Sequence, residues 1–175
     1  MRTIAIEPLS KAAFARFGEV VEFAGAQRIA INQGFAERVN GLAQIDVGAE
    51  GGSVNVSIFT ARARPQPIAV SLMERHPLGS QLFYPLQDRP WLVLVCDDPH
   101  APQTFRAFLA TGRQGVNYRR SVWHHPLLVT GDGEQFIVID RAGVGSNLEE
   151  IRLGAGQVLY LASQESNTTA ARALP

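Results

Sequence analysis

The sequence has little of what several kinds of enzyme chemistry require. Its one cysteine, Cys96, excludes an internal disulfide and lies in the apolar run WLVLVC, where we expect a structural thiol. Its one lysine, Lys11, is the only position open to Schiff-base chemistry. The sequence contains no phosphate-binding glycine loop, dinucleotide fingerprint or activated serine or cysteine motif, so no nucleotide or redox cofactor is expected.

The sequence also lacks an excess of either charge and a long apolar segment. Its formal net charge of +0 at pH 7 argues against nucleic acid or a membrane surface as a partner, because both attract basic proteins. No stretch reaches the roughly 18 apolar residues of a membrane span, and the N-terminus has no signal-peptide pattern. We therefore expect a cytoplasmic protein whose partner is a small molecule.

Turn residues divide the chain into short strands, at a spacing typical of a β-sandwich or barrel. The expected strands are TIAIEPL near the N-terminus, Val54–Thr60, Ile68–Met73, Gln81–Tyr84, Trp91–Val95, Phe105–Leu109, Leu127–Val129 and Phe136–Asp140, whereas Ile151–Leu153 and Val158–Tyr160 fit strand or helix. The segment LSKAAFARFGEVVE predicts a helix with Ser10 as its N-cap and Gly18 as its left-handed C-terminal residue. We expect one domain over residues 1–160 and a polar tail over 161–175.

Two segments of the chain carry His-Pro-Leu, beginning at His76 and at His125. Side chains alternate along a strand, so Glu74 and His76 point to the same side. Pro77 and Gly79 then end that strand, and Gln81 begins the next. The pattern predicts that the polar groups at 74, 76 and 81 face one interior, and that His125 faces away from its neighbour His124.

These segments resemble the two cupin motifs. The spacing Glu74-x-His76-x4-Gln81 is similar to the first motif, with Glu in place of its first His and Gln in place of its Glu, and His124 stands at the histidine position of the second. The blocks ERHPLGSQLFYPL, GVNYRRSVWHHPL, IDRAG and INQGFAERVNGLA resemble bacterial ureidoglycolate lyases. The resemblance implies an all-β, cupin-like double-stranded β-helix (a jelly-roll barrel) with a short N-terminal helix, and a homodimer. It also implies cleavage of (S)-ureidoglycolate to glyoxylate and urea in allantoin degradation.

This reaction needs proton transfer and no nucleophile. A base takes the carbinol hydroxyl proton, an acid protonates the departing urea nitrogen, and another group holds the carboxylate. His124, His76 and Glu74 are the candidate acid–base residues, because imidazole titrates near neutrality. Glu74, His76, Gln81 and His124 also occupy the cupin ligand positions, so a divalent metal is an open alternative, and the family resemblance suggests nickel.

Several further residues are candidates for holding the substrate. A guanidinium binds a carboxylate through two parallel hydrogen bonds, which makes Arg62, Arg106 and Arg141 candidates for that task. Asn32, Asn117 and Gln81 are uncharged polar candidates for the ureido group. Each arginine can equally form a surface ion pair, and Asn117 can be a turn residue.

Three other functions remain open on the sequence alone. The same fold would serve a metal-dependent dioxygenase or isomerase, or a small-molecule-binding cupin module without activity. Within the family, a hydrolase would release ammonia where a lyase releases urea. The substitutions in the first motif weigh against oxygen chemistry, and no DNA-binding segment is visible to accompany a sensor.

Overall fold

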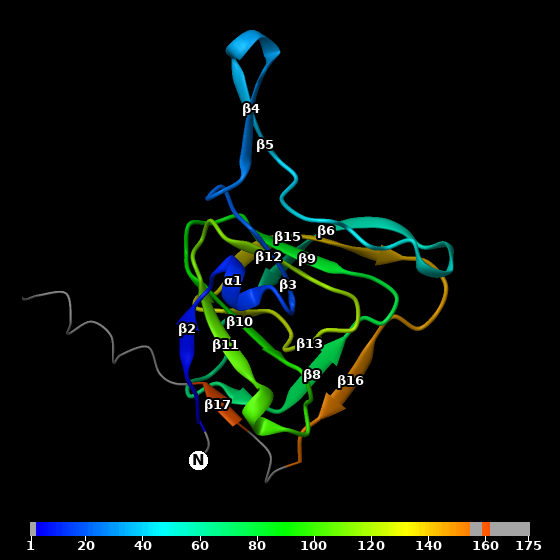
Figure 1. Cartoon of the computed structure of the whole chain (residues 1–175). Helices are drawn as coiled ribbons and strands as arrows, with labels where there is room; N and C mark the ends of the chain where they lie inside the picture. The colour runs from blue at the N-terminus through cyan, green and yellow to red at the C-terminus, as the bar shows by residue number, and fades with distance from the viewer. Residues whose placement is uncertain (1–2, 155–158, 162–175) are drawn as a thin grey trace, which may run out of the picture.

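Two β-sheets face each other in the computed structural model, which describes residues 3–154 and 159–161 (Figure 1). The first has the order β16-β8-β13-β10-β11-β2, with β14 also paired to β10, and the second has the order β3-β12-β9-β15-β6. The strands of the first sheet are β2 (Ile6–Pro8), β8 (Leu72–Arg75), β10 (Trp91–Cys96), β11 (Arg106–Ala110), β13 (Trp123–His124), β14 (Leu128–Val129) and β16 (Glu149–Arg152). Those of the second are β3 (Gly18–Val21), β6 (Ser53–Ala61), β9 (Gln81–Pro85), β12 (Gly115–Tyr118) and β15 (Glu134–Ala142).

From β8 onward the chain passes repeatedly from one sheet to the other. β8 lies in the first sheet, β9 in the second, β10 and β11 in the first, β12 in the second, β13 in the first, β15 in the second and β16 in the first. This alternation produces a jelly-roll barrel. The predicted all-β, cupin-like fold with a short N-terminal helix is confirmed.

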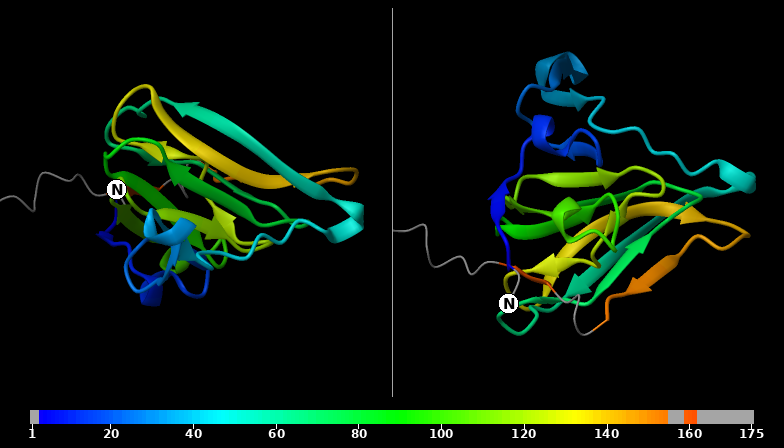
Figure 2. Two further views of the ribbon diagram at one scale, coloured as in Figure 1. Left: turned by 90° about the horizontal axis from the view of Figure 1, so that it is seen from above. Right: turned by 60° about the horizontal axis from the view of Figure 1, so that its bottom comes forward.

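Two smaller sheets accompany the barrel. β1 (Thr3–Ile4) pairs with β17 (Leu159–Leu161), which pairs with β7 (Ala69–Val70). β4 (Gln27–Ile31) and β5 (Ala36–Asn40) form a hairpin that projects away from the barrel (Figure 1, Figure 2). Short 3-10 turns occur at Asn32–Gly34, Ala49–Gly51 and Pro102–Thr104.

The N-terminal helix is shorter than the sequence predicts. α1 spans Lys11–Phe14, and Ser10 caps it as expected by accepting a hydrogen bond from Ala13 N at 3.2 Å. The prediction that Gly18 ends the helix is wrong, because Gly18 is the first residue of β3. A Cβ atom there would lie 2.0 Å from the carbonyl oxygen of Asn117, so Gly18 allows β3 to approach β12 closely. No helix within the described residues is long and apolar enough to cross a membrane.

The alternation of side chains along the central strand β10 separates two apolar clusters. Val93 and Val95 point between the two sheets, where they pack with Phe83, Phe136 and Val138 of the second sheet. Leu92, Leu94 and Cys96 point outward, into a second cluster beneath β1, β7 and β17. Burial, followed by the charges of Asp98 and Asp97, raises the pKa of Cys96 to about 12, as befits the structural thiol that we expected. The alternation of side chains along β10 therefore shows which of its residues face the barrel interior and which face outward.

All the strand predictions that fall on described residues correspond to strands, with boundaries shifted by at most two residues. The predicted segment Ile68–Met73 is divided between β7 and β8, and Ile151–Leu153 corresponds to β16. Val158, the first residue of another prediction, and residues 162–175 of the expected tail lie outside the described residues. The strands β3, β4, β5, β12 and β13 were not predicted, and the residues of β3 were assigned to the N-terminal helix instead.

Candidate active site

Glu74 and His124 lie directly opposite each other on the paired strands β8 and β13. His124 is also opposite Val95, whose side chain belongs to the interior cluster, so all three side chains face the inside of the barrel. The Nε2 atom of His124 lies 3.5 Å from Oε1 of Glu74. His124 is 2% exposed. The two halves of the predicted site therefore meet inside the first sheet.

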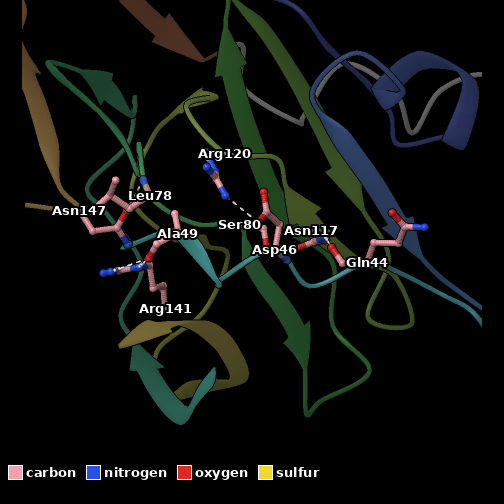
Figure 3. A network of polar contacts seen from close by, with 9 residues as sticks. All are labelled: Gln44, Asp46, Ala49, Leu78, Ser80, Asn117, Arg120, Arg141 and Asn147. Atoms are coloured by element: carbon pink, nitrogen blue, oxygen red, sulfur yellow. Dashed lines mark hydrogen bonds and ion pairs between the residues drawn. The ribbon is translucent and has the colours of Figure 1, made fainter. Parts of the chain in front are cut away.

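His76 reaches the same position from the loop that follows β8. Its ring centroid is 5.3 Å from that of His124. Its Nδ1 atom lies 2.7 Å from the backbone oxygen of Asn147, and the Asn147 side chain accepts a hydrogen bond from Leu78 N at 2.7 Å (Figure 3). A carbonyl oxygen only accepts, so Nδ1 of His76 carries the proton and Nε2 presents a lone pair. Nε2 is buried without a hydrogen-bond partner among the described residues.

The ring of His124 is oriented by a similar contact with the main chain. Its Nδ1 atom donates to the backbone oxygen of Val122 at 2.9 Å, and its Nε2 atom is buried without a hydrogen-bond partner in the described part of the chain. The ring of Tyr118 stacks on the imidazole, with centroids 4.2 Å apart and planes 10° apart. Tyr118 comes from β12 in the opposite sheet, so the second sheet fixes a residue of the first.

The three side chains form an electron-rich cluster. One atom each from Glu74, His76 and His124 lies within 4.8 Å of the others. The cluster places a carboxylate beside the buried, unpartnered Nε2 atoms of two imidazoles, so it is suited to exchange a proton or to hold a metal cation. This donor set, two histidines and one carboxylate, is also one that borderline divalent metals accept.

The pKa values of the cluster agree with this arrangement. Burial raises the pKa of Glu74, but contact with His124 and the charges of His124, His76 and His125 outweigh it, so the pKa lies below its ordinary value. Burial, followed by the charge of His124, lowers the pKa of His76, against the opposing effects of Asn147, Glu74 and Gln81. Glu74 is therefore ionised and His76 neutral near pH 7.

Gln81 completes the set of four predicted ligand positions. It lies opposite Tyr118 on the paired strands β9 and β12, with its side chain toward the interior. Its Oε1 atom is buried without a hydrogen-bond partner among the described residues, and its side chain favours protonation of the neighbouring His76. The structure thus brings Glu74, His76, Gln81 and His124 together.

The other predicted substrate-binding residues lie apart from this cluster. Arg106 shares the interior face but is engaged, through two hydrogen bonds to Glu7 and one to Ala13 O. Arg141 is 7% exposed and donates to the backbone oxygens of Ala49 and Val144. Figure 3 shows the guanidinium of Arg141 bonded to the backbone oxygen of Ala49.

The two asparagines and the remaining arginine also lie elsewhere. Asn117 has the opposite parity to Tyr118 and donates to Glu19 and to Gln44 O on the outer face of the second sheet (Figure 3). Asn32 is exposed at the tip of the projecting hairpin. Arg62 is exposed directly after β6 and makes no ion pair with any described residue.

His125 contributes no atom to the cluster. It is 3% exposed, and its backbone N–H donates to Leu94 O at 2.9 Å. Its ring atom Nδ1 contacts the backbone oxygen of Pro126 at 2.7 Å. Burial is the main reason that the pKa of His125 falls to about 4. It is a neutral, buried side chain near pH 7.

Two residues of the site were not predicted from the sequence. Tyr118 lies in the block GVNYRR, and the parity of a strand at 115–118 would have assigned it to the interior had that strand been recognised. Asn147 lies in a loop far from His76 in the sequence, and no local pattern connects the two.

Comparison with known proteins assigns the chain to a family. The family model described as Ureidoglycolate lyase matches residues 1–159. A protein named Ureidoglycolate lyase from Azotobacter vinelandii is 49% identical over 163 residues, which cover 92% of this chain and 98% of that protein. Ureidoglycolate lyase 1 from Rhizobium meliloti is 50% identical over 163 residues, covering 93% and 96%.

Solved structures resemble the chain more distantly. A 3,4-ketoisomerase from Helicobacter canadensis matches with a TM-score of 0.46 and 12% identity, over 77% of this chain and 90% of that one. QdtA, a sugar 3,4-ketoisomerase from Thermoanaerobacterium thermosaccharolyticum, matches with a TM-score of 0.44 and 14% identity, over 79% and 89%. Likenesses this remote carry no information about the chemistry of the site.

Proposed function

The chain belongs to the ureidoglycolate lyase family, and we propose that Glu74, His76 and His124 are the residues with which it cleaves ureidoglycolate to glyoxylate and urea. The observation that supports this assignment is the meeting of three acceptor atoms, all within 4.8 Å, inside the barrel. Family membership disfavours the dioxygenase, isomerase and binding-module alternatives.

The two imidazoles are suited to start the reaction. Nε2 of His124 or His76 accepts the proton of the carbinol hydroxyl, while the C–N bond breaks and the carbonyl of glyoxylate forms. The urea nitrogen then takes a proton from the imidazolium that has just formed. Glu74 stabilises that imidazolium through its negative charge, because its carboxylate lies 3.5 Å from His124 Nε2.

The same three residues also fit a divalent cation, and we propose this as the alternative scheme, because an ion held by both Nε2 atoms would leave neither free to act as the base. Their two unpaired Nε2 atoms are buried, and a cation would satisfy both together with the carboxylate. Gln81 offers an amide oxygen as a weaker fourth ligand. Nickel is compatible with imidazole and carboxylate donors, and such an ion would act as a Lewis acid toward a substrate oxygen.

The proposal is tested by replacing each histidine. His124→Ala should lose at least about a hundredfold in urea release while remaining folded, the low end of a general acid–base contribution. His125→Gln, at the adjacent position, is the matched control and should retain most activity. Near-wild-type turnover in His124→Ala, or greater damage from a folded His125→Gln, would refute the assignment.

Two further measurements separate the chemical alternatives. Assaying urea and ammonia from one substrate distinguishes a lyase from an ammonia-releasing hydrolase. Treatment with a chelator, followed by metal analysis and addition of nickel, should remove and restore both the bound ion and the activity. Full activity in protein shown to be free of metal would mean that the side chains act alone.

We also propose that the enzyme is a homodimer. β6 is an edge strand of the second sheet, and its outward-facing side chains Val54, Val56 and Ile58 are 57%, 65% and 62% exposed. An open, apolar edge favours pairing with a second copy, and the zero net charge offers little repulsion. Light scattering should give twice the 19.0 kDa of one chain, and Val56→Glu should shift the mass toward the monomer.

A further inference from the structure

The interior face of the second sheet, opposite the histidines, carries polar side chains that the mechanism does not yet use. Ser57 of β6 is paired with Val138 of β15, and Asn55 with Asp140. Paired residues in an antiparallel sheet project to the same side, and Val138 belongs to the interior cluster. Ser57, Asn55 and Asp140 therefore face the same interior as Glu74, His76 and His124.

We call Asn55, Ser57 and Asp140 the polar wall. The register of the sheet places it beside the cluster of Glu74, His76 and His124. Ile139 is paired with Leu82, so continuing the register sets Asp140 next to Gln81. Gln81 is paired with Tyr118, which stacks on His124. Tyr118, Gln81, Asp140 and Asn55 thus form one row across β12, β9, β15 and β6.

Most of the polar atoms of the wall that remain available to a ligand are hydrogen-bond acceptors. The side-chain nitrogen of Asn55 donates to Oδ1 of Asp140 at 2.9 Å, which leaves the amide oxygen of Asn55 and the second carboxylate oxygen of Asp140. The hydroxyl of Ser57 and the amide oxygen of Gln81 are buried without partners among the described residues. Buried polar atoms without partners are costly, so the Ser57 hydroxyl and the Gln81 oxygen are suited to pair with a ligand, and the exposed Asn55 and half-buried Asp140 offer their oxygens beside them.

We propose that Asn55, Ser57 and Asp140 bind the terminal amide of the ureido group and determine the specificity for it. This inference rests on the proposed function, because it assigns the leaving group to the wall opposite the acid–base cluster. A terminal –NH2 offers two donors to the oxygens of Asn55 and Asp140, and the Ser57 hydroxyl can donate to the ureido carbonyl oxygen. A ligand with a methyl group in place of the –NH2 would leave those acceptors unpaired and bind less well.

Two unreactive ligands isolate this contact. Ureidoacetate keeps the carboxylate and the ureido group of the substrate but lacks the hydroxyl, and N-acetylglycine replaces its terminal –NH2 with a methyl group. As competitive inhibitors of the wild-type enzyme, ureidoacetate should bind roughly tenfold or more tightly, because a lost hydrogen bond to a charged acceptor has an effect of that size. Equal inhibition constants for the two ligands would overturn the proposal.

Variants then assign the contact to residues. Asn55→Ala should reduce the preference for ureidoacetate to within about threefold while leaving the inhibition constant of N-acetylglycine nearly unchanged. Val56→Ala, at the next position on the same strand but on the outer face, should keep the full preference. If Asn55→Ala does not fold, Ser57→Ala makes the same test, and an unchanged preference in a folded variant overturns the assignment.

The two proposals fail separately. An active His124→Ala enzyme would refute the catalytic assignment, whatever the ligands do. A wild-type enzyme that requires His124 but does not distinguish ureidoacetate from N-acetylglycine would refute only the binding role proposed for the polar wall.

Discussion

Tyr118→Leu tests whether the second sheet positions the imidazole of His124. The Tyr118 ring is 4% exposed, stacks on His124 at 4.2 Å, and contacts Phe14 and Phe83 with centroids 6.0 and 6.1 Å away. Each aromatic pair stabilises by about 0.5–1.5 kcal/mol, so losing the three pairs should lower the free energy of unfolding by about 2–4 kcal/mol. A domain of this size normally tolerates that loss, and the variant should remain folded.

The effect on turnover should be larger than this loss suggests. Without the stacked ring the imidazole of His124 keeps its bond to Val122 O but can tilt, and a misplacement of about 1 Å can reduce the rate roughly a hundredfold. We expect kcat to fall by roughly ten- to a hundredfold with little change in KM.

Tyr118→Phe is the matched control for the lost ring. It keeps the ring that stacks on His124 and removes only the hydroxyl. Burial, followed by the charge of Glu74, raises the pKa of that hydroxyl, so it is uncharged in the wild-type protein. Urea release and denaturant unfolding measure both variants. If Tyr118→Leu is folded and as active as Tyr118→Phe, stacking does not position His124.

Two further predictions concern the surroundings of the cluster. Asn147→Ala removes the acceptor of Leu78 N–H, so it should lower the free energy of unfolding by about 1–3 kcal/mol and also reduce activity. Asn147→Asp keeps an acceptor oxygen and should retain more stability and more activity. Equal losses in the two variants, measured by denaturant unfolding and by urea release, would contradict this. The pKa of His125 is about 4 in the folded protein and near 6.5 in the unfolded chain, so its contribution to stability is complete above pH 6.5 and decreases by about 3 kcal/mol as pH falls to 4. His125→Gln should therefore lose less stability on acidification, and unfolding curves that respond to pH as the wild-type curves do would refute the assignment.

The sequence predicts the cluster well because its members lie close to strands with strong patterns. Glu74 and His76 are two residues apart at the end of an extended segment, and the apolar run of β10 indicates which sheet is central. The contact between Glu74 and His124 follows only from pairing β8 with β13. The resemblance to the cupin motifs predicted only that the two residues share a site, since periodicity does not specify which strands are neighbours.

The substrate-binding candidates illustrate what sequence patterns do not contain. Arg106 and Arg141 were selected because arginine suits a carboxylate, yet each is engaged by groups distant in the sequence, Glu7 for one and Ala49 O for the other. Ser57 and Asn55 were not among the predicted substrate-binding residues, because about half of the residues of their strand are polar. Their orientation depends on the register with β15.

The protons on the two histidines are held by the main chain. His76 donates to the carbonyl of Asn147, and His124 donates to the carbonyl of Val122. Many catalytic histidines depend on a carboxylate side chain for this purpose, and one substitution can then change the tautomer. A substitution at 122 or 147 leaves the carbonyl oxygen in the chain, so the tautomer of both imidazoles is protected against most single mutations. Substitutions around this site should therefore shift the imidazoles, and so change the rate, before they change which ring nitrogen carries the proton.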